Sequence, residues 1–369
     1  MKRKPTLLII GRENDPHIID VLENIVNKEI SIYRFDPGEF PSKYTFSLKL
    51  NNIGKYTANL SSKKYSLDLN NVDLVWNRVR SRSKACEDIN PTQKLWTEEN
   101  CTRFLAYIYE LILCPWIPYR PNSFVPQFCR EAALINTVLQ GQRFAEGDVK
   151  PSPENKLYQL IVAASLGFTI PNTLITNNVH SFLEFYSKMK GNLISKKFVD
   201  LNIRSDNEPL LPYTHKITRN DLLRVHSIRH APVLFQENVD KLLELRITVV
   251  GDNVFAAEIF NTKDIKQSID WRHYPIYNLE KFYSTHTLPE KVKYLCIELV
   301  KKLGLCFGAI DMILHPQKGY IFLEINPNGQ WGWIEELTDM QITKSFSELL
   351  INKTYMSYKA NISKKQCQI

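Results

Sequence analysis

In the segment FLEINPNGQWGWIEE (Phe322–Glu336) an apolar run ends in Glu324 and Asn326, polar groups that are costly to bury without partners. The segment directly upstream and overlapping it, AIDMILHPQKGYIFLEIN, is typical of an antiparallel hairpin with its turn centred on the QK pair. In that register Asp311 lies directly opposite Glu324. Asn326 follows two residues later, so it shares the face of Glu324.

Two facing carboxylates repel each other unless a cation lies between them. Carboxylate and amide oxygens are the ligands that Mg²⁺ prefers, with nucleotide phosphates completing its coordination. The pattern therefore predicts a magnesium site formed by Asp311, Glu324 and Asn326. The alternative is a hairpin edge in water on which the acidic residues are incidental. The other face of the second strand is predicted to pack in the core: Ile321, Leu323 and Ile325.

Cationic groups elsewhere in the chain could hold the polyphosphate of such a nucleotide. Lys196 in LISKKF can project from its strand into a cleft, although solvent exposure is the simpler interpretation. Glu244 and Arg246 are two residues apart on one predicted strand and share a face, where they suit ribose hydroxyls and a phosphate or acyl phosphate. The alternative for this pair is a surface ion pair on an edge strand. Arg272 in DWRH is a weak indication alone.

Net charge and composition exclude few function classes. The chain has 369 residues, 47 of them basic and 39 acidic, which gives a net charge of +8. We interpret this as a mildly basic surface, with an anionic substrate as second choice. No nucleic-acid module and no P-loop is recognisable, so neither nucleic-acid binding nor a Walker-type NTPase is predicted.

Cysteine usage and hydropathy predict a cytoplasmic protein without a membrane anchor. Seven scattered cysteines contain no CxxC pair, which argues against a disulfide scaffold or a zinc site. The apolar stretch after the N-terminal lysines is too short for an export signal, and no stretch approaches transmembrane length.

The order of predicted elements indicates an α/β protein with several lobes. The segments 6–11, 17–28 and 30–36 form a strand, helix and strand at the spacing of a parallel α/β unit. We expect four parts along the chain: an N-terminal α/β domain (1–125), a central domain (126–238), a C-terminal lobe (239–352) that ends with a last helix near 338–352, and a polar basic tail (353–369).

These residues resemble the ATP-grasp superfamily, and within it the microviridin-type peptide maturases, the graspetide ligases. The likeness is strong over 30–50 and 154–350. Its motifs are IYRFDPGEFP, ENKLYQLIVAASLGFTIPNTLIT, LISKKF, LFQENVDKLLELRITVVGDNVFAAEI, DWR, FGAIDMIL and FLEINPNGQWGWIE. The resemblance implies an ATP-grasp fold, with an N-terminal parallel α/β pre-ATP-grasp domain and two lobes that clasp ATP.

Carried onto this sequence, the resemblance implies a role for each of the following residues. Lys156 and Lys196 contact phosphates. Gln236, Glu237 and Val239 line the adenine pocket, and Glu244 holds the ribose. Arg246 and Arg272 face the γ-phosphate and the reacting carboxylate as catalytic residues, while Asp311, Glu324 and Asn326 bind Mg²⁺. The cofactors implied are ATP and Mg²⁺.

The implied reaction is ATP-dependent activation of a carboxylate as an acyl phosphate, followed by ester or amide formation. In a peptide maturase the partner is a precursor peptide with a leader and an acidic core, and the resemblance suggests a homodimer. The alternative within enzymes is a ligase that adds an amino acid to a small-molecule or protein-tail carboxylate. A binding module that kept the fold without catalysis is the alternative outside enzymes. Trp331 and Trp333 could wall the substrate side of the site or pack under the last helix.

Overall fold

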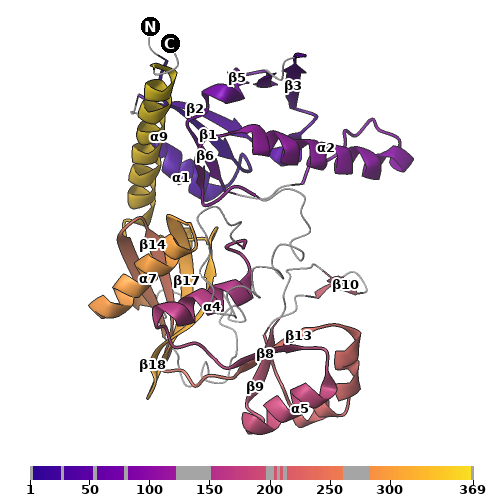
Figure 1. Cartoon of the computed structure of the whole chain (residues 1–369), viewed down its shortest axis with the longest axis vertical. Coiled ribbons are helices and arrows are strands. Elements are labelled where there is room, and N and C mark those ends of the chain that lie inside the picture. Colours follow the sequence, from indigo (N-terminus) through magenta and orange to yellow (C-terminus); the bar gives the residue numbers. More distant parts are fainter. Residues whose placement is uncertain are drawn as a thin grey trace.

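The computed structural model has three sheets of four or five strands that follow one another along the molecule, and two smaller sheets (Figure 1). The structure describes residues 3–25, 29–52, 56–78, 82–121, 151–196, 203–205, 208–210, 214–260 and 283–366. An N-terminal sheet lies at one end, a central sheet at the other, and a C-terminal sheet between them. This arrangement confirms the predicted α/β class.

The N-terminal sheet is parallel and has the strand order β2-β1-β6-β7. Its strands are β1 (Thr6–Ile10), β2 (Ser31–Phe35), β6 (Leu74–Asn77) and β7 (Trp116–Ile117). One face packs against helices α1 (Pro16–Ile25) and α9 (Ile342–Gln366). The other face packs against α2 (Pro91–Leu111) and a small antiparallel sheet. Because both faces are covered, all five residues of β1 are buried, and four of them form the apolar run LLII.

The small sheet that covers the N-terminal sheet has the order β3-β4-β5. It consists of β3 (Tyr44–Leu50), β4 (Tyr56–Ser62) and β5 (Ser66–Asp68), with single 3-10 turns at Pro37–Glu39 and Leu69–Asn71. Its inward residues, Ala58 and Leu60 among them, join Leu8 and Ile10 of β1 in one buried cluster.

The central sheet is antiparallel and has the order β12-β9-β13-β8. Its strands are β8 (Thr173–Thr176), β9 (Leu193–Lys196), β12 (His215–Lys216) and β13 (Val233–Glu237). Helix α5 (Val179–Lys188) covers one face, with the ring of Phe182 lying 4.6 Å from that of Phe235. Short elements complete this part of the chain: β10 (Ile203–Ser205), β11 (Glu208–Leu210), α6 (Arg219–Leu222) and the 3-10 helix Val225–His230.

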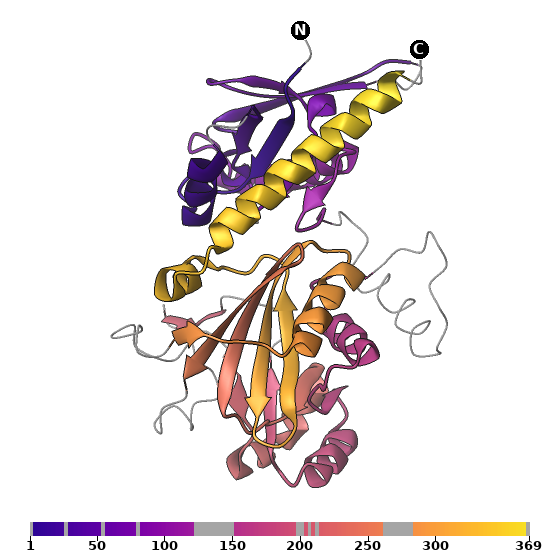
Figure 2. The same ribbon diagram turned by 90° about the vertical axis from the view of Figure 1, so that its left-hand side faces the viewer.

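The C-terminal sheet is antiparallel and has the order β16-β15-β14-β17-β18 (Figure 2). Its strands are β14 (Leu243–Val250), β15 (Asn253–Phe260), β16 (Tyr283–Thr285), β17 (Phe307–His315) and β18 (Gly319–Asn326). Helices α4 (Lys156–Leu166) and α7 (Glu290–Lys302) pack on one face and bury a large apolar cluster. The β14–β15 hairpin turns at Gly251, whose φ of +60° is a left-handed conformation that favours glycine.

The β17–β18 hairpin has the predicted pairing at its functional end and a different register at its turn. Asp311 lies opposite Glu324 as expected, but Met312 lies opposite Phe322, so a β-bulge falls between these pairs. Phe322 is therefore fully buried, whereas Leu323 is only half-buried. The prediction that Leu323 packs in the core was wrong, because the bulge exchanges its place with that of Phe322.

The turn of this hairpin owes its shape to a side chain. His315 Nδ1 accepts hydrogen bonds from the backbone N–H groups of Gln317 and Lys318, both at 3.0 Å. Gly319 then adopts a φ of +71°. The histidine thus stabilises a turn whose Gln-Lys sequence has no turn preference of its own.

The C-terminal end of the chain differs from the expected tail. Helix α8 (Gly332–Thr338) is followed by α9, which runs to Gln366 instead of ending near residue 352. Helix α9 extends from the C-terminal sheet to the N-terminal lobe, where it packs along α1 (Figure 2). Among the described residues, no helix is long and apolar enough to cross a membrane.

Candidate active site

The face of the C-terminal sheet opposite α4 and α7 carries charged residues from three adjacent strands. On β14 and β17, Arg246 and Asp311 are directly opposed, and Arg246 Nη1 donates to both carboxylate oxygens of Asp311, at 2.9 and 3.1 Å. On β18, Glu324 opposes Asp311. Because β14 is central in the sheet, the alternative of an ion pair between Glu244 and Arg246 on an edge strand was wrong.

The carboxyl group of Asp311 is in an environment that disfavours its charge. Burial raises the pKa of Asp311, the guanidinium of Arg246 opposes this rise, and the carboxylate of Glu324 adds to it. The charge of Lys196, from the central sheet, also acts to lower it. Lys196 therefore lies close enough to the C-terminal sheet to act on Asp311.

Lys156 completes the charged group from the first turn of α4. Its Nζ lies 2.9 Å from Glu324 Oε2, and the two side chains are 37% and 35% exposed. Asn155 caps the helix by accepting hydrogen bonds from the N–H groups of Leu157 and Tyr158. The cap fixes the start of α4, so it also fixes where Lys156 points.

Asn326 is exposed at the end of β18, two residues beyond Glu324 and on the same face. Its Oδ1 accepts a hydrogen bond of 2.9 Å from the N–H of Asn328. Gly329 lies so close to the sheet that an added Cβ would be 2.4 Å from Ala309 Cβ and 2.7 Å from Arg246 Nη2. Only glycine allows this approach, which places the turn after β18 directly on the charged face.

Two predicted nucleotide residues share a face of the central sheet. Lys196 and Gln236 both lie on the face opposite Phe235 and α5. Gln236 is 2% exposed, and its Nε2 donates to Thr173 Oγ1 at 3.0 Å. Its Oε1 has no hydrogen-bond partner among the described residues, as also holds for Arg246 Nε. A buried acceptor and a buried donor of this kind fit an adenine amino group and a phosphate or carboxylate oxygen, respectively.

Glu237 links the central sheet to the β17–β18 turn. Lys318 Nζ lies 2.8 Å from its Oε1, and Asn172 Nδ2 donates to its Oε2 at 2.7 Å. Burial acts to raise the pKa of Glu237, but the hydrogen bonds from Lys318 and Asn172 hold it below its usual value. Val239 follows half-buried, beside a segment that Asn192 fixes through three hydrogen bonds with Asn238.

Glu244 lies at the other end of the charged face. It forms an ion pair with Lys241, three residues earlier, and both side chains are mostly buried. Its charge, after burial, contributes to raising the pKa of Tyr283 on β16. Trp333 packs against Tyr283 with ring centroids 5.2 Å apart, whereas Trp331 is buried beneath α9 against Phe346. Of the two predicted positions for Trp331, the structure therefore has the one in which it packs under the last helix.

Arg272 lies outside the residues that the structure describes. Within the described ranges, no group of three or more His, Cys, Asp or Glu side chains could hold a metal ion. The oxygen donors that the hairpin does bring together are two carboxylates and the amide of Asn326, a set suited to a hard cation that also takes phosphate oxygens.

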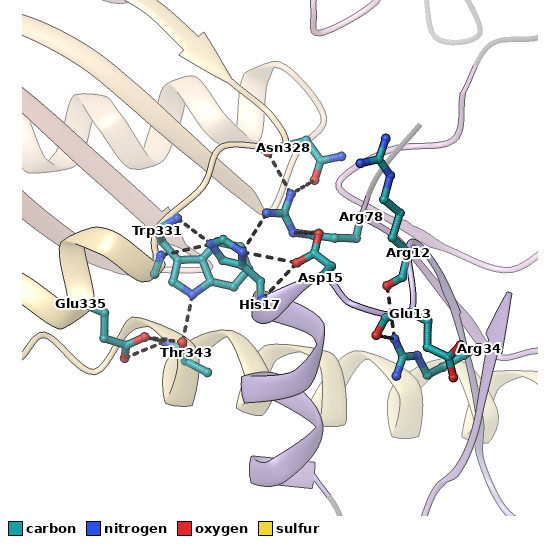
Figure 3. Close-up of polar contacts among 11 residues, drawn as sticks. Arg12, Glu13, Asp15, His17, Arg34, Arg78, Asn328, Trp331, Glu335 and Thr343 are labelled. Carbon is teal, nitrogen blue, oxygen red and sulfur yellow. Dashed lines mark hydrogen bonds and ion pairs between the residues drawn. The ribbon is translucent and has the colours of Figure 1, made fainter. Parts of the chain in front are cut away.

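The residues that hold the turn after β18 from the N-terminal lobe were not predicted (Figure 3). Arg78 donates to the backbone and side-chain oxygens of Asn328, at 3.3 and 3.4 Å. His17 accepts from the backbone of Trp331 at 3.1 Å. Their only sequence indication is position: each directly follows an apolar strand or begins the helix after one, at the carboxyl edge of a parallel sheet.

Comparison with known proteins finds a family for the N-terminal domain and similar structures for the whole chain. Residues 6–117 match the family model of the MvdD pre-ATP grasp domain. The whole chain is similar to a RiPP-associated ATP-grasp ligase of Chryseobacterium gregarium, solved in complex with ADP and a leader and core peptide. That match has 26% identity and a TM-score of 0.79, and it covers 94% of this chain and 97% of that one.

Two macrocyclases of Microcystis aeruginosa are similar over the same share of this chain. MdnC, solved with the precursor peptide MdnA, is 26% identical with a TM-score of 0.72, and MdnB is 27% identical with a TM-score of 0.67; both matches cover 94% of this chain and 99% of theirs. A search of curated protein sequences found no match. The family match at the N-terminus and the likeness along the whole chain agree with the charged face described above, and the chain is an MvdD-like, ADP-forming ATP-grasp ligase.

Proposed function

We propose that the chain uses ATP to activate Asp or Glu side chains of a ribosomally made precursor peptide and closes ω-ester or ω-amide rings. The observation that carries this proposal is the cluster of Lys156, Arg246, Asp311 and Glu324 on one face of the C-terminal sheet. It lies in a chain that is similar over 94% of its length to a ligase solved with ADP, leader and core peptide.

The nucleotide is proposed to lie between the central and C-terminal sheets. Gln236 would accept from the adenine amino group through its Oε1, and Glu237 and Val239 would line the same pocket. Lys156 and Lys196 would contact the phosphates, and Glu244 the ribose. Support comes from the orphaned oxygen of Gln236 and from the action of the Lys196 charge on Asp311.

Asp311, Glu324 and Asn326 are the proposed ligands of Mg²⁺. When bound there, Mg²⁺ supplies a positive charge that holds and neutralises phosphate oxygens. The same charge would favour the ionised form of Asp311, whose pKa burial otherwise raises. Lys156, now paired with Glu324, would be available to a phosphate when the carboxylate turns to the metal.

The reaction proceeds in two displacements. A carboxylate oxygen of the peptide attacks the γ-phosphorus of ATP, and the bond to the ADP oxygen breaks, which leaves an acyl phosphate on the peptide. A hydroxyl or amine of the same peptide then attacks the acyl carbon, and phosphate leaves as the nucleophile loses its proton. Arg246 and Arg272 are proposed to stabilise the charge on the transferred phosphoryl and acyl groups. Each ring removes one water from the peptide and converts one ATP to ADP and phosphate.

The proposed partner is a precursor peptide with a leader and an acidic core. The net charge of +8 would favour encounter with such a core. Two further proposals accompany this one. The chain is proposed to act as a homodimer, which light scattering after size-exclusion chromatography would test. It is also proposed to act in the cytoplasm, where ribosomes release the precursor.

The decisive experiment measures the intact mass of an acidic peptide encoded beside this gene after incubation with the chain, ATP and Mg²⁺. ATP-dependent loss of one or more waters is the expected result. An unchanged peptide, with ADP released when a free amino acid is added, would overturn this proposal in favour of a small-molecule ligase. An unchanged peptide with no ADP release from any acceptor would point to a binding module.

A further inference from the structure

One short loop joins the candidate site to the N-terminal lobe. It runs from Asn326 to Trp331 and is called the 326–331 loop below. On its inner side Arg246 Nη2 donates to the carbonyl oxygen of Gln330 at 3.4 Å. Gly329 lies so close to the same guanidinium that an added Cβ would clash with it. The loop therefore packs on Arg246, the arginine that pairs with Asp311 on β17.

His17, in the first turn of α1, holds the end of this loop from the N-terminal side (Figure 3). Its Nε2 accepts from the backbone N–H groups of Trp331 and Gly332, both at 3.1 Å. Nε2 therefore acts as the acceptor that satisfies two backbone donors at the start of α8. Asp15 Oδ1 is 3.4 Å from Nδ1 and also accepts from the backbone N–H of His17 at 3.0 Å. Asp15 thus holds both the backbone and the ring of His17 in place.

Arg78 holds the middle of the loop from the end of β6. Its side chain is 4% exposed and lies 5.5 Å over the ring of Trp331 while it donates to both oxygens of Asn328. Asn328 Nδ2 in turn donates to the carbonyl oxygen of Asn77 at 3.2 Å. Arg78 Nη2 also lies within hydrogen-bond distance of His17 Nδ1, at 3.1 Å. Burial lowers the pKa of Arg78, and the Asp15 carboxylate opposes this.

The Asp15–His17 pair looks like a general-base dyad, but the geometry does not allow that role. The nitrogen that would take a proton already accepts two backbone hydrogen bonds, and the His17 side chain is only 9% exposed. Every polar contact that His17 makes with the C-terminal half of the chain is with the loop or the first residue of α8. Its chemistry is therefore that of a support.

The geometry points to Asp15, His17 and Arg78 as positioning residues for the ligation, because they hold the 326–331 loop and thereby fix Asn326 and Arg246. This inference rests on the proposed function of those two residues. Arg34 supports the arrangement from β2, since its Nη2 donates to the carbonyl oxygens of the β1–α1 loop that leads to Asp15. A misplacement of about 1 Å in such a support lowers turnover by about 100-fold in enzymes that depend on orientation.

The test compares His17→Leu, which removes the acceptor, with His17→Gln, whose amide oxygen can accept the same backbone donors. His286→Leu is the matched control, because His286 is 13% exposed, makes two hydrogen bonds and lies on the face of the sheet away from the site. We expect His17→Leu to lower kcat for ADP release with the precursor peptide by about 10- to 100-fold at unchanged KM for the peptide. His17→Gln should recover kcat to within about threefold of the wild type.

Equal losses of kcat in His17→Leu and His286→Leu would overturn the inference, since they would mean a general loss of stability. If His17→Leu does not fold, Arg78→Lys replaces it: the charge stays, the two-oxygen contact with Asn328 is lost, and kcat should fall about tenfold at a similar melting temperature. Unchanged kcat in a folded Arg78→Lys would overturn the inference as well.

A failure of the proposed function would be visible separately. If the wild-type chain binds a fluorescent ATP analogue with Mg²⁺ but does not turn over the peptide, the proposed substrate is wrong and the affinity for the analogue becomes the measurement. His17→Leu should then weaken that affinity about tenfold relative to His286→Leu, with recovery in His17→Gln. Equal affinities of the two leucine variants would overturn the positioning role.

Discussion

The 326–331 loop is held on one side by the β17–β18 hairpin and on the other by the N-terminal lobe, and the two sides differ in how far apart their residues lie in the sequence. Asp311 and Glu324 come from two consecutive strands. His17 lies 314 residues before Trp331, and Arg78 lies 250 residues before Asn328. One side follows from strand alternation, whereas the other depends on how two lobes meet.

The two sides also differ in exposure. The side chains of Lys156, Glu324 and Asp311 are 37%, 35% and 25% exposed, whereas those of His17, Arg78 and Asp15 are 9%, 4% and 10% exposed. Partly exposed charges can exchange one partner for a ligand at small free-energy cost. Buried charges need permanent partners. Lys156 and the two carboxylates of the hairpin side can therefore exchange a partner for a ligand, whereas the three residues of the N-terminal side hold the loop.

The largest effect is expected from removing a charge on the hairpin side. Glu324→Gln keeps the size of the side chain but removes the charge that faces Asp311 and pairs with Lys156. We expect the rate of ADP release to fall by about 10²–10³-fold, the size of effect seen when one preorganised electrostatic group is removed. Glu336→Gln, an exposed change on α8, should leave the rate within about twofold. Equal rates in the two variants would refute the metal assignment.

The next effect tests the point where the two sides meet. In Gly329→Ala the new Cβ would lie 2.4 Å from Ala309 Cβ, so the loop must move away from the sheet. We expect the melting temperature to fall, as for overpacking of about 1–3 kcal/mol, and ADP release to fall about tenfold or more. In the matched Gly332→Ala, the nearest atom is His17 Nε2 at 3.4 Å, an ordinary contact. If Gly332→Ala is the more damaging of the two, the loop is not seated as described.

A smaller effect is expected where the end of α9 contacts the N-terminal lobe. Asn361 on α9 donates to Asp73 Oδ1 at 3.0 Å, and the Asp73 side chain is fully buried between Arg3 and the N–H of Thr6. Asn361→Leu should lower the free energy of unfolding by about 1–2 kcal/mol, measured by urea denaturation. Ser363→Ala, an exposed change on the same helix, should change it by less than about 0.5 kcal/mol. A result of the same size for both would mean that α9 does not secure the N-terminal lobe.

The smallest effect concerns the Lys318–Glu237 pair. Because the folded-state pKa of Glu237 is lowered, its contribution to stability is present above about pH 4.3 and is lost as the pH falls through the lower folded value. Lys318→Met should therefore melt slightly below the wild type at pH 7, by about 1 kcal/mol or less, and the difference should shrink on acidification below pH 4.3. A difference that grows on acidification would contradict the assigned direction.

Sequence patterns determined the parts of this protein that rest on short-range regularities. Alternation along β18 placed Glu324 and Asn326 on one face, and the pairing with Asp311 followed from one hairpin. The segments 6–11 and 30–36 were expected to be strands, and the structure has β1 and β2 there. Each of these follows from a period or a backbone preference that acts over a few residues.

The register near the hairpin turn, the length of α9 and the contacts of the N-terminal lobe depend on tertiary contacts that the sequence patterns do not contain. The bulge that buries Phe322 and the histidine that caps the turn depend on neighbours that no alternation pattern encodes. The second half of helix α9 is rich in polar residues, and its Tyr355 and Tyr358 donate hydrogen bonds to the backbone of residues more than 300 positions earlier in the chain. His17 and Arg78 gained their partners in the same way, because a side chain's role across a lobe interface depends on which surface it meets, and that is set by the whole fold.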